Sequence, residues 1–307
     1  MKKFILNVLF FTLCLFPLSV VYAAPTQSAE TSSKNKTTVN LASVSAIVMD
    51  KKNNSVLFEK NSKIVMPIAS LTKLMTAMVI LDAKLSLKEK IRFAKEDKTS
   101  INNYYSRIRI GSELSRGDVL RIALMSSENL AASSLERTYP GGSSAFVEAM
   151  NKKARALGMK QTHFVNSTGL SEKNVSTASD LAKMVAAATK YKLIKQYTTT
   201  QVYTARFKKP RYNLAYTNTN VLVRAGHQDV KLSKTGYLDE AGRCLVMLRR
   251  IGNKDMIMVF LDSFGKRSPI GDANRIKKWL QTGNKGKVAK AASNYQRVKL
   301  AFYSKDN

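Results

Sequence analysis

The hydrophobic and polar positions along the chain change their period twice. Two alternating runs, 41–50 and 55–61, lie on either side of a polar break, which predicts a β-hairpin. A helical period follows in residues 70–85, 116–127, 143–158 and 176–191. Beyond about Lys192 the period returns to two in residues 201–207, 228–237, 241–252 and 254–263, and residues 269–281 predict a closing helix.

The order of these elements predicts the fold class. One early hairpin, a central block of helices and a late set of strands indicate that both ends of the chain meet in one antiparallel sheet, with a helical insertion between them. We therefore expect an α/β (α+β) domain over residues 40–281. Residues 282–307 are basic and lack the apolar stripe of a membrane-lying helix, so we expect a mobile tail there.

The first residues have the pattern of an export signal. Two lysines precede an almost unbroken apolar run over residues 4–21, and small residues ending at Ala23 follow it. The run is just long enough for a transmembrane anchor, but the small residues favour cleavage, so residues 1–23 are interpreted as a signal peptide. Residues 24–39 are rich in Ser, Thr, Lys and Asn, which is typical of a flexible linker.

Composition and charge narrow the class of protein. The 307 residues include 51 Lys and Arg against 21 Asp and Glu, a formal net charge of +30, and 44% of them are hydrophobic. This apolar content suffices for a folded core and excludes a disordered, collagen-like or multi-pass membrane protein. Of the two cysteines, Cys14 would leave with the signal peptide, so Cys244 has no disulfide partner. No metal site or cofactor is predicted.

The scarcity of histidine makes lysine the candidate catalytic base. Ser70 and Lys73 are three residues apart at the start of an apolar helix, which places the hydroxyl and the amine on one face. Burial lowers the pKa of a lysine, so that its amine can take a proton from serine near neutral pH. Alternatively, Ser70 only caps a helix and Lys73 reaches water. Ser-x-x-Lys also occurs at Ser33 and Ser263, so this motif alone decides nothing.

Two further short motifs lie downstream. Ser127 and Asn129 form a Ser-x-Asn motif that follows Met125 at the end of the second predicted helix, and Lys234, Thr235 and Gly236 lie in a late predicted strand. Each alone has an ordinary structural interpretation, a turn or helix cap for the first and a surface lysine beside a bulge glycine for the second. The three motifs in this order and these contexts are specific.

This constellation resembles the penicillin-binding proteins and the serine β-lactamases. The segments KIVMPIASLTKLMTAMV, RGDVLRIALMSSENLAA, THFVNSTGL and LSKTGY are similar to segments of low-molecular-mass D-Ala-D-Ala peptidases. The resemblance implies a β-lactamase/transpeptidase-like fold, serine acyl transfer on peptidoglycan stem peptides, and covalent inhibition by β-lactams. Together with the export signal it implies a periplasmic protein, with loose membrane attachment left open.

The resemblance also implies roles for the motif residues. Ser70 would attack a D-Ala carbonyl with Lys73 as its base, and Ser127 would pass a proton to the leaving amine. The backbone N–H groups of Ser70 and Tyr237 would form the oxyanion hole. The implied substrate-binding residues are Asn129, Lys234, Thr235 and Gly236.

Smaller features bear on the branch of the family. A class A β-lactamase needs a Glu-x-x-x-Asn element after the second motif, but residues 158–179 contain only Glu172, with Ser176 four positions later. We therefore expect penicillin to acylate Ser70 and stay bound. The 45 residues after Asp262 are too few for the C-terminal β domain and membrane helix of related carboxypeptidases. The segments SSEN and YPGG also resemble the endopeptidase branch.

We predict an endopeptidase that cuts D-Ala–diaminopimelate cross-links. A D-Ala-D-Ala carboxypeptidase is the alternative, and a non-catalytic wall-binding protein is the outside hypothesis. Residues 192–234 contain nine Lys or Arg and one Asp, which would either attract anionic stem peptides or only keep the surface solvated. The export signal and the lack of a zinc-finger or RNP-like motif argue against nucleic acid. The expected partners of this monomer are stem peptides and β-lactams, with other wall hydrolases left open.

Overall fold

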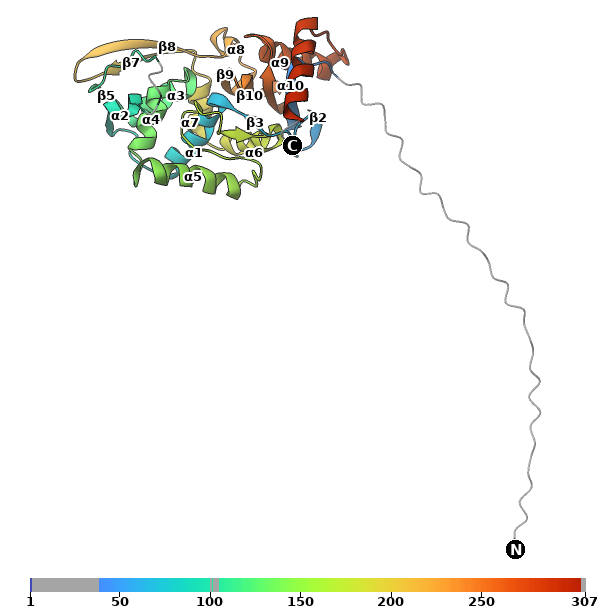
Figure 1. The fold of residues 1–307 in the computed structure, drawn as a ribbon, viewed down its shortest axis with the longest axis horizontal. Helices are drawn as coiled ribbons and strands as arrows, with labels where there is room; N and C mark the ends of the chain where they lie inside the picture. Colours follow the sequence, from blue (N-terminus) through green and yellow to red (C-terminus); the bar gives the residue numbers. More distant parts are fainter. Residues whose placement is uncertain (2–38, 100, 102–104, 305–307) are drawn as a thin grey trace. The chain divides into compact units, whose positions relative to one another are not determined.

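The computed structural model describes Met1, residues 39–99, Ile101 and residues 105–304 (Figure 1). The chain divides into two units, Met1–Lys36 and Thr37–Asn307, and every described helix and strand belongs to the second. The predicted signal peptide beyond Met1 and all of the predicted linker except Val39 lie outside the described residues. Within the described part, no helix is both long and apolar enough to cross a membrane.

The described residues form strands at both ends of the folded unit and mostly helices between them. The strands are β1 (Ser43–Asp50), β2 (Val56–Lys60), β3 (Met66–Pro67), β4 (Lys90–Arg92), β5 (Glu113–Ser115), β6 (Val175–Ser176), β7 (Val202–Phe207), β8 (Tyr212–Thr217), β9 (Val230–Leu238), β10 (Gly242–Ile251) and β11 (Lys254–Ser263). The helices are the 3₁₀ helix η1 (Ala69–Thr72) and the α-helices α1 (Lys73–Asp82), α2 (Lys95–Thr99), α3 (Arg116–Met125), α4 (Asn129–Arg137), α5 (Gly142–Ala156), α6 (Ala178–Ala188), α7 (Lys192–Thr198), α8 (Val221–Arg224), α9 (Ser268–Thr282) and α10 (Lys290–Tyr303).

One five-stranded antiparallel sheet joins the two ends of the folded unit. Its strand order is β2-β1-β11-β10-β9, and Ile47 of β1 pairs with Val259 of β11. Helices from the middle of the chain pack against it, so the predicted fold class, a sheet from both chain ends with a helical insertion, is confirmed. Because β9 is last in the order, no described strand pairs with its outer edge, the kind of edge along which an extended peptide can bind.

The sheet is buried on both faces. Ile47 and Met49 of β1 belong to the core shared with α1 and α6, whereas Ala46 and Val48 belong to the core shared with α9. In Figure 1, α9 and α10 are the red helices and α5 is the green helix of the central block. All eight residues of β1 are therefore buried, which its partly alternating sequence does not reveal.

The C-terminal residues differ from the expected mobile tail. Residues 290–303 form α10, and two of its tyrosines reach the buried Asp262 on β11, with O–O distances of 2.5 Å for Tyr295 and 2.9 Å for Tyr303. Burial of Asp262 raises the pKa of its carboxyl group. The inward face of α10 consists of small and aromatic residues with polar tips, so no simple apolar stripe marks it in the sequence.

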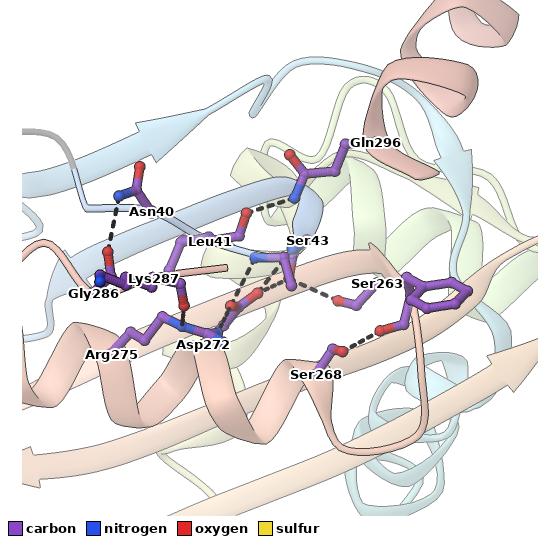
Figure 2. Close-up of polar contacts among 12 residues, drawn as sticks. Asn40, Leu41, Ser43, Ser263, Ser268, Asp272, Arg275, Gly286, Lys287 and Gln296 are labelled. Carbon is purple, nitrogen blue, oxygen red and sulfur yellow. Dashed lines mark hydrogen bonds and ion pairs between the residues drawn. The ribbon is translucent and has the colours of Figure 1, made fainter. Parts of the chain in front are cut away.

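A buried carboxylate holds the start of the sheet to the C-terminal helices (Figure 2). Asp272 on α9 accepts hydrogen bonds from the backbone N–H groups of Ala42 and Ser43, both at 2.8 Å, and from the Ser43 hydroxyl at 2.5 Å. The Arg275 guanidinium donates to the same carboxylate at 2.6 Å. From α10, Gln296 donates to the Leu41 carbonyl. These contacts fix the first residues of β1.

We expect Asp272→Ala to lower the free energy of unfolding by about 3 kcal/mol, because two buried backbone donors and one arginine lose their acceptor. Urea denaturation followed by circular dichroism measures this loss. Glu148→Ala, which removes an exposed carboxylate from α5, should change the free energy by less than about 0.5 kcal/mol. A loss below about 1 kcal/mol for Asp272→Ala would contradict the expectation.

Candidate active site

Ser70 and Lys73 lie where η1 passes into α1. The 3₁₀ turn contains Ser70, and the α-helix begins at Lys73, so the predicted single helix is divided at this point. The Lys73 amine donates a hydrogen bond of 2.9 Å to the Ser70 hydroxyl oxygen. The spacing of three residues therefore brings the candidate base to the candidate nucleophile.

The Lys73 amine is enclosed by neutral oxygen atoms. It also donates to the Asn129 side-chain oxygen at 2.7 Å and to the Thr168 carbonyl at 2.6 Å. Burial lowers the pKa of Lys73 to about 7, partly opposed by the negative charge of Glu128. Much of the amine is therefore uncharged near neutral pH, which is the form that can accept the proton of serine.

The second lysine of the site comes from β9. The Lys234 amine donates to the Ser127 hydroxyl at 2.9 Å and to the Thr235 carbonyl at 2.8 Å. Burial, and then the nearby charge of Lys73, lowers the pKa of Lys234 well below its ordinary value. The Thr235 hydroxyl bonds at 2.7 Å to the hydroxyl of Thr219, which precedes α8. The second and third motifs therefore meet in space.

Close backbone contacts bring the three motifs together. A methyl group on Gly236 would lie 3.2 Å from the Ser70 backbone nitrogen and 3.1 Å from the Ala69 Cβ, so β9 approaches η1 more closely than a side chain would comfortably allow. Gly169 meets the Ala69 carbonyl on another side, where a Cβ would overlap it. Ala69 and Ser127 both have positive φ, at 47° and 63°, a conformation that costs energy for residues other than glycine.

The predicted site residues surround one cleft of about 510 Å³. Every predicted site residue except the two lysines lines it: Ser70, Ser127, Asn129, Thr235, Gly236 and Tyr237. The lysines are buried behind these residues and reach them through hydrogen bonds. The remaining lining residues are Leu170, Thr219, Val221, Arg224, Arg243, Cys244, Leu245, Lys266, Arg267, Pro269 and Ile270.

Other candidate residues lie in contexts unsuited to this chemistry. The Ser263 hydroxyl bonds to that of Ser43 at 2.7 Å, while the side chain of Lys266 is exposed, so this copy of Ser-x-x-Lys is not a reactive pair. Glu172 is exposed on its loop, and Ser176 stands four positions later in place of the asparagine of a Glu-x-x-x-Asn element. Burial raises the pKa of Cys244 to about 12, so its thiol stays protonated near neutral pH.

Three neighbours of the site were not among the predicted residues. Thr168 and Thr219 contact the site through a carbonyl and a hydroxyl, so their residue types carry little signal. Glu128 lies inside the Ser127 to Asn129 motif, caps α4 and has a pKa raised by burial. The sequence shows that Glu128 lies within the motif, but only the fold determines that it is buried near Lys73.

These features define a serine acyl-transfer site. The serine hydroxyl lies beside a buried amine that is largely neutral, a second buried lysine lies behind the cleft, and the edge of the sheet lies beside the serine. Residues 29–265 match the family described as D-alanyl-D-alanine carboxypeptidase, peptidase S11. Because this match covers more than half of the chain, the protein belongs to that family.

Individual relatives and solved structures agree with this assignment. The chain is 48% identical to a D-alanyl-D-alanine endopeptidase of Pseudomonas aeruginosa over 83% of each protein. It is 44% identical to one of Escherichia coli over 95% of each. The crystal structure of the Streptomyces K15 DD-transpeptidase superimposes with a TM-score of 0.74 at 26% identity, covering 79% of this chain and 98% of that one. Penicillin-binding protein D2 of Listeria monocytogenes, bound to ampicillin, gives 0.67 at 29% identity, covering 78% and 97%.

The pKa of Lys73 predicts the pH dependence of acylation by benzylpenicillin. Because the neutral amine is the base, the acylation rate constant should rise about tenfold per pH unit below a pKa of about 7 and level off above it. Stopped-flow fluorescence between about pH 5.5 and 8.5 measures the profile. Lys73→Ala should lose at least about 100-fold in rate at every pH. A flat profile for the unaltered protein would contradict this role.

We expect Gly236→Ala to slow acylation about 10- to 100-fold, because the added methyl group pushes β9 away from the Ser70 backbone nitrogen. The same penicillin assay measures the effect, and thermal unfolding confirms that the variant is folded. Gly271→Ala on α9 is the matched control, since its methyl group would meet only the flexible Arg275 side chain. Equal rates for the two variants would show that the close approach is not needed.

Proposed function

We propose that the protein is a serine D-alanyl-D-alanine endopeptidase that cleaves peptidoglycan cross-links. The observation that carries the proposal is the 2.9 Å contact between the Lys73 amine and the Ser70 hydroxyl, at a cleft that also holds Ser127. The endopeptidase names of the two relatives, at 48% and 44% identity, support the same activity.

In the proposed first step Ser70 is the nucleophile. Its hydroxyl oxygen attacks the carbonyl carbon of D-Ala while the neutral Lys73 amine takes the proton. The backbone N–H groups of Ser70 and Tyr237 hold the developing oxyanion, a role that the close approach of Gly236 to η1 supports. The amide bond then breaks, which leaves D-Ala as an ester on Ser70.

The other motif residues bind the substrate and protonate its leaving group. Ser127, hydrogen-bonded to Lys234, gives its hydroxyl proton to the amine of the leaving group and takes in its place the proton that Lys73 received from Ser70. Lys234 and the Thr235 hydroxyl hold the carboxylate next to the scissile bond, and this negative charge favours the charged form of Lys234. Asn129 binds the substrate backbone. Water then hydrolyses the ester and frees Ser70 for another cycle.

Carboxypeptidase activity is the second candidate. It removes a terminal D-Ala through the same acyl-enzyme, and the description of the matching family as D-alanyl-D-alanine carboxypeptidase favours it. The two activities differ only in the leaving group, a single D-Ala in one case and a whole stem peptide in the other. The chemistry at Ser70 therefore does not separate them.

The proposal extends to location and inhibition. We propose a monomeric periplasmic enzyme, on the basis of the N-terminal export pattern and the peptidoglycan substrate. β-Lactams acylate Ser70, a proposal supported by the ampicillin complex of the similar Listeria protein. The exposed position of Glu172 supports a slow release of the drug.

Digestion of purified muropeptides tests the activity. The protein should convert cross-linked dimers to monomers with an initial rate at least about tenfold above its release of D-Ala from pentapeptide monomers, as chromatography with mass spectrometry would show. Ser70→Ala should abolish both reactions. Loss of pentapeptide without loss of dimers would contradict the proposed endopeptidase activity and support carboxypeptidase activity.

A further inference from the structure

The active-site cleft has a cationic wall in addition to the reacting residues. Arg224 from α8, Arg243 from β10, and Lys266 and Arg267 from the segment between β11 and α9 all line it. Among the described residues that line the cleft, none is acidic. This wall is therefore suited to an anionic part of the substrate.

Arg224 is linked through Thr219 to Thr235, which under the proposed function binds the substrate residue next to the scissile bond. Its guanidinium donates to the carbonyls of Asn218 at 2.6 Å and Thr219 at 3.3 Å through a single nitrogen, Nη1. Thr219 in turn bonds through its hydroxyl to Thr235, which under the proposed function holds the carboxylate of the leaving residue. Arg224 is thus held close to the leaving side of the scissile bond.

Arg243 is held by the neighbouring strand. It lies opposite Tyr237 in the register of β9 and β10, and its guanidinium carbon is 3.5 Å from the centre of the Tyr237 ring. Tyr237 is itself fixed by a hydrogen bond to Asp239. Stacking uses the face of a guanidinium and leaves the N–H groups at its edge directed outward, where they match a carboxylate.

The leaving group of a cross-linked substrate carries more negative charge than a single D-Ala. D-Ala has one carboxylate, next to the scissile bond. A stem peptide linked through diaminopimelate has that carboxylate and further ones, on its glutamate and at its C-terminus. Cations on the leaving side other than Lys234 therefore find a second carboxylate there only when the substrate is cross-linked.

We propose that Arg224 and Arg243 bind a second carboxylate on the leaving stem peptide and so form a subsite for cross-linked substrates. This inference rests on the proposed endopeptidase function. It places the preference for cross-links in the wall of the cleft, separate from the acyl-transfer residues. Lys266 and Arg267, both exposed, add positive charge to the same wall.

Two synthetic cross-linked peptides test the subsite. They differ only in whether the carboxylates of the leaving stem, apart from the one on the reacting residue, are free or amidated. For the unaltered protein, amidation should lower kcat/KM about tenfold, the effect of losing a charge-assisted contact. For Arg224→Ala/Arg243→Ala, amidation should change kcat/KM by less than about twofold.

A matched control removes the same charge elsewhere. Arg206→Ala/Arg211→Ala takes two exposed arginines from the β7–β8 hairpin, outside the cleft, and should keep the tenfold sensitivity to amidation. Each rate is divided by the rate of penicillin acylation of the same variant, which corrects for altered folding or chemistry. If the double variant does not fold, the single change Arg224→Ala, at an exposed position, provides the comparison.

The outcomes separate this inference from the proposed function. Equal sensitivity to amidation in the unaltered protein and in the Arg224 and Arg243 variants would overturn the subsite while leaving the endopeptidase intact. Failure of the unaltered protein to cleave either cross-linked peptide, with D-Ala still released from pentapeptide, would overturn the endopeptidase and the subsite together.

Discussion

The site depends on the burial of two lysine amines in one small volume. Within the part of the chain that the structure describes, neither Lys73 nor Lys234 forms an ion pair; their partners are hydroxyl, amide and carbonyl oxygens. Two ammonium groups so placed would repel each other and would lack the solvation of water, so the folded protein favours at least one neutral amine. That neutral amine is what makes the Ser70 hydroxyl a usable nucleophile.

This arrangement costs stability, and the rest of the fold compensates. Positive φ values at Ala69 and Ser127 are unfavourable for residues with side chains, yet both lie next to reacting groups. The contact of Gly169 with the Ala69 carbonyl holds Ala69 at the start of the buried helix α1, and a hydrogen bond from Lys234 holds Ser127. A tightly packed interior thus maintains a geometry that the local backbone disfavours.

The sequence predicts the fold and the pair of Ser70 and Lys73 well, but it predicts the residues around this pair less well. The change from strand to helical period and back indicates the shared sheet, and the three-residue spacing of Ser70 and Lys73 sets their contact. By contrast, α4 and α10 were not predicted. In α4 alanines and serines fill most of the buried face between Leu130 and Leu135, and in α10 the buried residues are Ala292 and Tyr303, so neither helix has a continuous apolar stripe. The carbonyl of Thr168 depends on the path of a loop, which residue types do not determine.

The position of β1 has a consequence for how the chain acquires its structure. This strand is made early, but its neighbour β11 and its anchor Asp272 lie more than 200 residues later, and β1 pairs with β11 over most of its length. Until those residues exist, β1 has only the short β2 beside it, and a lone hairpin is marginally stable in water. The five-stranded sheet can therefore form only after nearly the whole polypeptide has been made.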